Sequence, residues 1–124
     1  MLVEAEKLKA QLNGDFDETV RSIYLTLANA KLPGSMTVHP GAHGYISQKL
    51  RFEVNSRQYC SAVLNQSWVL WYFRRPAMSD LTIEPEELVQ IFVTDELTGQ
   101  REVKLRIKDI GTAHAVLGWM HQNS

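Results

Sequence analysis

The hydrophobic period of the sequence changes to two near residue 45, and this change constrains the fold more than any other feature. Apolar and polar side chains alternate from Ile46 to Val54, as they do in a strand that is buried on one side only. Similar runs follow, bounded by turn sequences or by prolines. The strands that these runs predict are 46–54, 58–64, 68–75, 88–94 and 101–108.

Helical patterns stand before and after these strands. Residues 16–27 place their apolar side chains on one helical face, and the proline and glycine at 32–34 end the pattern. Residues 110–122 predict a short C-terminal helix. A helix is therefore expected on each side of the sheet-forming segment.

Two segments allow two structures each. Residues 2–12 form either a separate helix or the first part of one helix that is kinked at Asn13-Gly14. Residues 85–97 suit a helix as well as a strand, because Pro85 favours the first turn of a helix. The order and register of the strands are also left open.

The short connections between successive strands favour antiparallel pairing, since parallel pairs need long crossovers. We therefore predict an α+β fold with an N-terminal helix, a five-stranded antiparallel meander sheet and a C-terminal helix. The chain has 124 residues, which is the usual size of one domain, and residues 1–124 are predicted to form a single domain.

Composition argues against a membrane partner and favours an intracellular protein. No apolar run approaches the roughly 18 residues that a membrane-spanning helix needs. The single cysteine, Cys60, cannot form an internal disulfide, which is typical of a reducing compartment, and we expect a cytoplasmic location. The net charge is −1, yet residues 35–76 contain five Lys or Arg and only one acid, Glu53.

The third predicted strand is apolar on both faces, unlike the first and last. One face carries Trp68, Leu70 and Tyr72, and the other carries Val69, Trp71 and Phe73. If the N-terminal helix covers one face, the other needs the C-terminal helix, a second copy of the chain or a ligand. We expect a homodimer through this face. A small-ligand pocket beneath the C-terminal helix, lined by Trp71, Phe73, Arg75 and Trp119, is the close variant.

Two histidines, His39 and His43, stand in a segment rich in proline and glycine. Ligands four residues apart share one face only within a helix, and Pro40, Gly41 and Gly44 argue against a helix there. A zinc site would also need further ligands. We therefore predict no metal and no cofactor, and an enzyme or small-ligand protein that uses these histidines is the third hypothesis.

The leading hypothesis is a non-enzymatic binding module, homodimeric through the apolar face of its sheet, with a protein or a small molecule as a further partner. The sequence contains no catalytic constellation and no motif that identifies a family. The expected binding residues are Trp71, Phe73, Arg75, Trp119, His39 and His43.

A single-stranded nucleic-acid-binding protein is the alternative from another class. Tyr59, Trp68, Trp71, Tyr72 and Phe73 lie among Lys49, Arg51, Arg57, Arg74 and Arg75. Aromatic rings for bases beside cations for phosphates are what single-strand binders use. The pI of about 6.4 and the apolar residues on both faces of the third strand favour the leading hypothesis.

Overall fold

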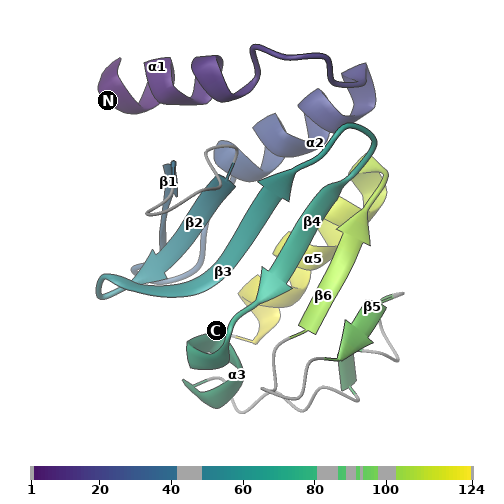
Figure 1. The fold of residues 1–124 in the computed structure, drawn as a ribbon. Coiled ribbons are helices and arrows are strands. Elements are labelled where there is room, and N and C mark those ends of the chain that lie inside the picture. The colour runs from purple at the N-terminus through teal and green to yellow at the C-terminus, as the bar shows by residue number, and fades with distance from the viewer. Residues whose placement is uncertain are drawn as a thin grey trace.

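The computed structural model describes residues 2–41, 49–80, 87–88, 92, 94–97 and 103–123. In this part of the chain one antiparallel sheet has the strand order β1-β2-β3-β4-β6-β5 (Figure 1). Its strands are β1 (Thr37–Pro40), β2 (Lys49–Val54), β3 (Arg57–Leu64), β4 (Val69–Phe73), β5 (Thr94–Leu97) and β6 (Val103–Ile107). The predicted α+β class with an antiparallel sheet is confirmed.

The helices are α1 (Leu2–Gln11), α2 (Glu18–Ala28), α3 (Arg75–Asp80) and α5 (Ile110–Gln122). The first of the two open questions is thereby answered, because α1 is a helix separate from α2. In Figure 1, α2 and α5 lie side by side behind the sheet, and these two helices contact each other. The short α3 follows β4 directly and contacts β3.

Both long helices therefore cover the same face of the sheet, which differs from the arrangement expected from the sequence. The register places Trp71 opposite Ala62 and Leu105, on the face toward the helices. Trp71 and Phe73 are fully buried there. The alternate residues of β4, Leu70 and Tyr72, are only partly buried and point to the other face. That face needs no second apolar layer, because the half-buried rings on it are covered by charged side chains.

The order of the strands differs from a simple meander at two places. The chain adds a short edge strand, β1, which ends at Pro40 and pairs with β2. At the other side, β6 pairs with β4 and β5 takes the edge. The strand alternation of β6 explains its inner position, because Val103, Leu105 and Ile107 are all buried on the helix side.

The segment predicted as a strand at 88–94 is described only in part. Its backbone bond from Phe92 N–H to the Leu88 carbonyl, at 2.8 Å, has the spacing of a helical turn. Strand structure begins at Thr94, later than predicted. The rest of the helix-or-strand question over 85–97 falls on 85–86, 89–91 and 93, which lie outside the described residues.

A buried polar pair joins α1 and α2 to the sheet. The Tyr24 hydroxyl donates to Gln11 Oε1 at 2.7 Å, and the Gln11 amide donates to the Lys49 carbonyl at 3.0 Å. Burial raises the pKa of Tyr24, so this hydroxyl keeps its proton throughout the physiological range. The pair fixes the otherwise weakly amphipathic α1 beside the start of β2.

Because Trp71 belongs to the core, we expect Trp71→Ala to lower the free energy of unfolding by about 3–5 kcal/mol. Urea unfolding monitored at two protein concentrations measures this change. The loss should be equal at both concentrations, and Leu25→Ala, at an exposed position of α2, should leave stability nearly unchanged. A loss that diminishes at high protein concentration would instead place Trp71 in an interface between copies.

Candidate functional site

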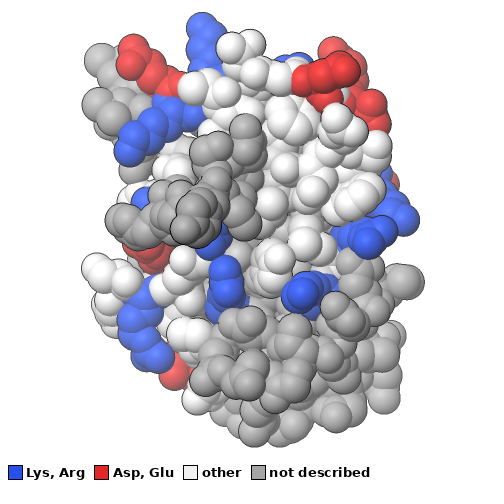
Figure 2. Space-filling view, in the orientation of Figure 1, with Lys and Arg blue, Asp and Glu red and all other residues white. Residues whose placement is uncertain are grey.

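We define the open face as the face of the sheet opposite α2 and α5. It is formed by Lys49, Arg51, Glu53, Ser61, Val63, Trp68, Leu70, Tyr72, Arg74, Lys104 and Arg106. Figure 2 shows this side of the molecule, with Lys and Arg side chains over its middle and Asp and Glu toward its margins. Among the described side chains, five cations share the open face with one acid, Glu53.

The strand register arranges part of the open face in one row across the sheet. His39 pairs with Arg51, Arg51 with Ser61, Ser61 with Tyr72, and Tyr72 with Lys104. Neighbouring strands lie about 4.8 Å apart, so a row across five strands spans about 19 Å. Ser61, in the middle of the row, is fully buried, and its hydroxyl has no hydrogen-bond partner among the described residues.

Cations lie over the aromatic rings of the open face. The Arg74 guanidinium carbon is 5.0 Å from the centroid of the Tyr72 ring, and Lys104 Nζ is 5.7 Å from it. A second pair joins Arg106 and Trp68 at 4.5 Å. Each such pair contributes roughly 0.5–1 kcal/mol at an exposed site. These contacts hold positive charge beside aromatic surface at two places on the open face.

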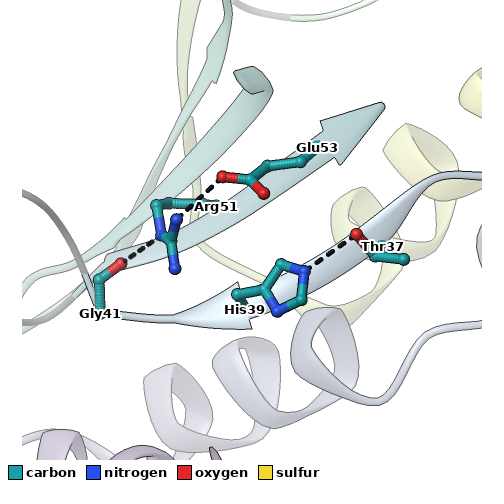
Figure 3. Close-up of polar contacts among 5 residues, drawn as sticks. All are labelled: Thr37, His39, Gly41, Arg51 and Glu53. Atoms are coloured by element: carbon teal, nitrogen blue, oxygen red, sulfur yellow. Dashed lines mark hydrogen bonds and ion pairs between the residues drawn. The ribbon is translucent and has the colours of Figure 1, made fainter. Parts of the chain in front are cut away.

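Arg51 is held in a fixed orientation at the β2 side of the open face (Figure 3). Its Nε donates to the Gly41 carbonyl at 2.9 Å, and its Nη1 lies 2.8 Å from a carboxylate oxygen of Glu53. Both side chains are about one-fifth exposed (20% and 19%). The guanidinium is thereby pre-oriented before any ligand arrives, which reduces the entropy that binding would cost.

The cations of the open face are close enough to affect one another. Burial lowers the pKa of Lys49, and the positive charges of Arg74 and Arg51 lower it further. An anion that binds among these cations reduces their mutual electrostatic repulsion. The electrostatics of the open face therefore suit an anionic ligand.

A polar contact fixes α3 beside the open face. The Tyr59 hydroxyl donates to Asp80, whose carboxylate also lies 3.4 Å from Arg57. The hydrogen bond to Asp80 raises the pKa of Tyr59, followed by burial and the negative charge of Asp80, while the Arg57 charge lowers it. The Arg74 N–H donates to the Tyr59 carbonyl at 2.9 Å, so this contact also positions the start of α3.

The structure brings three of the predicted binding residues together, but in the core. Trp71, Phe73 and Trp119 are 1%, 0% and 8% exposed. Their ring centroids lie 5.9 Å apart for Trp71 and Phe73 and 5.4 Å for Phe73 and Trp119. The apolar face expected to meet a second copy is thus packed against α5 of the same chain. The C-terminal helix with Trp119, the first of the covers considered for it, takes that place.

The other three predicted binding residues do not join this cluster. His39 lies in the edge strand β1, where its Nε2 is 2.9 Å from the Thr37 hydroxyl (Figure 3). Arg75 is the first residue of α3. His43 lies outside the described residues. Within the described part of the chain, no three His, Cys, Asp or Glu side chains gather closely enough to hold a metal ion.

A hollow of about 780 Å³ lies between β6 and α5. Trp119, Phe92 and Leu105 form apolar walls, and Lys108 and Asp109 add charge. This is the region in which a small-ligand pocket was expected, but Trp71 and Phe73 do not line it. The hollow is lined by β6 and α5, whereas the two core rings lie between the sheet and α5.

The sequence analysis did not include Lys104 and Arg106 in the predicted site. The missing information was the order of the strands, because β6 lies beside β4 only when β5 takes the edge. With that order, Lys104 falls next to Tyr72 and Arg106 next to Leu70.

Comparison with family models, with curated proteins and with solved structures finds no match for this chain. The function proposed below is therefore based on its own residues. Of the helices that the structure describes, none is both long and apolar enough to cross a lipid bilayer.

The contact between Tyr59 and Asp80 has a measurable consequence. Asp80→Ala should lower the pKa of Tyr59, because it removes the hydrogen bond and the negative charge that raise this pKa. Arg57→Gln should change the pKa in the opposite direction, since the Arg57 charge lowers it. Ultraviolet difference titration of each variant against the parent protein measures both changes. Shifts of the same sign would contradict the assigned contacts.

Proposed function

We propose that this chain is a non-enzymatic binding module whose open face holds an extended anionic ligand. The observation that carries the proposal is the juxtaposition of five cations with one acid among the described side chains of this face. Glu53, the one acid among the described side chains of this face, is paired with Arg51, and the strand register places the backbone of a further acid, Glu96, opposite Lys104. Anions are attracted to such a surface although the chain as a whole carries a net charge of −1.

The shape of the surface favours an extended ligand over a compact one. The cations are spread over three strands, from Lys49 and Arg51 on β2 to Lys104 and Arg106 on β6. Three strand spacings, about 14 Å, separate the backbones of β2 and β6, so a ligand that crosses the strands can contact the cations of both more readily than one small anion can. A chain of negative charges that crosses the strands can contact both.

Homodimerisation stays a prediction, and the core packing of Trp71 removes the surface on which it was based. A two-fold contact through the open face would bring the same cations of two copies together, which like-charge repulsion disfavours. Light scattering over a range of protein concentrations tests self-association. A dimer found in this way would have to use another surface, such as a sheet edge.

The proposal is tested with inorganic polyphosphate, a linear polyanion without aromatic groups. We expect binding that weakens with added salt, measured by isothermal titration calorimetry. Neutralising Lys104 and Arg106 together as Lys104→Gln/Arg106→Gln should reduce the affinity by about tenfold or more, because two charge-assisted contacts are lost.

Lys7→Gln/Lys31→Gln is the matched control, because it removes the same charge from two exposed lysines that lie outside the sheet. It should bind polyphosphate nearly as well as the parent protein. Equal losses in the two double variants would show that net charge alone governs binding. That result, or the absence of salt-dependent binding, would overturn the proposal.

A further inference from the structure

The geometry of the open face points to single-stranded nucleic acid as the ligand, an inference that rests on the proposed anion-binding function. We infer that the phosphates of one strand lie over the cations while its bases stack at Tyr72 and Trp68. A surface that recognises its ligand by charge alone would bind any polyanion. The positions of the two rings distinguish nucleic acid from the others.

Each ring stands beside the cations that would hold the backbone. Tyr72 lies between Arg51 and Lys104 in sheet order and carries Arg74 at 5.0 Å from its ring centroid. Trp68 precedes β4 and carries Arg106 at 4.5 Å. A base can stack on an aromatic ring or on a guanidinium plane, and here guanidinium groups lie over both rings.

These two rings are also more exposed to solvent than the aromatic rings of the core. Tyr72 and Trp68 are partly exposed, whereas Trp71, Phe73 and Phe52 are fully buried on the opposite face. Interior packing therefore accounts for one set of aromatic side chains on β4 and leaves the other set at the surface. Partly exposed aromatic rings among cations form the platform that single-strand binders use.

A duplex fits this surface less well than a single strand. The open face is built on a sheet, and its cations lie on β2, directly after β4, and on β6. Duplex DNA is usually read by an inserted helix or ribbon, and its paired bases offer no free faces to rings such as Tyr72. In a single strand the bases can separate and stack on the protein, so only this form uses the aromatic part of the open face.

The experiment measures fluorescence anisotropy with four labelled probes of about 12 units, a length within the range of known single-strand sites. The probes are a mixed-sequence RNA strand, the same sequence as DNA, its DNA duplex, and polyphosphate of matched length. A polyglutamate peptide serves as the acidic-protein probe. We expect either or both of the single strands to bind about tenfold or more tightly than the duplex, polyphosphate or polyglutamate.

Variants separate stacking from charge. Tyr72→Leu should weaken binding of the single strand by about tenfold and affect polyphosphate binding much less, because it removes a ring and no charge. Phe16→Leu is the matched control, since Phe16 and Arg21 form a similar ring–cation pair, 6.0 Å apart, outside the open face. Lys104→Gln should weaken both ligands and reduce the salt dependence of single-strand binding by about one phosphate contact, or about 0.7 in logarithmic slope.

A Tyr72→Leu protein that fails to fold is recognised by its circular dichroism, and Trp68→Leu then provides the second test of stacking. The inference is overturned if single strands bind no more tightly than polyphosphate or polyglutamate. It is also overturned if the folded ring variants bind single strands like Phe16→Leu. In both cases the proposed anion-binding function would still stand if polyphosphate binds in a salt-dependent way and this binding requires Lys104 and Arg106. If none of the probes binds, both the nucleic-acid inference and the proposed anion-binding function are overturned.

Discussion

The structure depends above all on the packing of Trp71. Its ring centroid lies 4.9 Å from that of Phe52 on β2 and 5.9 Å from that of Phe73, which in turn lies 5.4 Å from that of Trp119 on α5. Tilted and edge-on contacts of this kind add to the free energy gained from burying large rings. The cluster ties β2 and β4 to the C-terminal helix. One face of the sheet is therefore buried in the interior of the chain.

This burial of one face determines which side chains the other face of the sheet can carry. Because α2 and α5 lie together on the Trp71 side, none of the described helices covers the open face (Figure 1). A surface without an apolar layer must be compatible with water, and charged side chains over partly exposed rings provide this. The same arrangement places positive charge over partly exposed aromatic rings on the open face. The buried core and the proposed binding surface thus lie on opposite sides of β4.

Local patterns predicted the elements well, and the arrangement of the elements less well. Alternation predicted β2 and β6 nearly as they are, whereas turn sequences and Pro76 bounded the runs that form β3 and β4. The placement of Trp71 and Tyr72 could not be predicted, because residues 68–73 are apolar on both faces and either set could face the helices. β1 was missed because four residues ending at Pro40 give too short a pattern. Lys104 joined the candidate site only through the strand order, a long-range property that no local period contains.

The position of Cys60 allows unfolding of the chain to be followed by chemical labelling of its thiol. The side chain is fully buried on β3, opposite Phe73, and burial raises the pKa of its thiol. A thiol reagent reacts with the thiolate, so the folded state should resist labelling for as long as the sheet stays closed. Because this is the single cysteine of the chain, each labelled molecule records one opening of the core. Where labelling is faster than reclosing, the labelling rate therefore gives the frequency of that opening under native conditions, without denaturant and without an engineered cysteine.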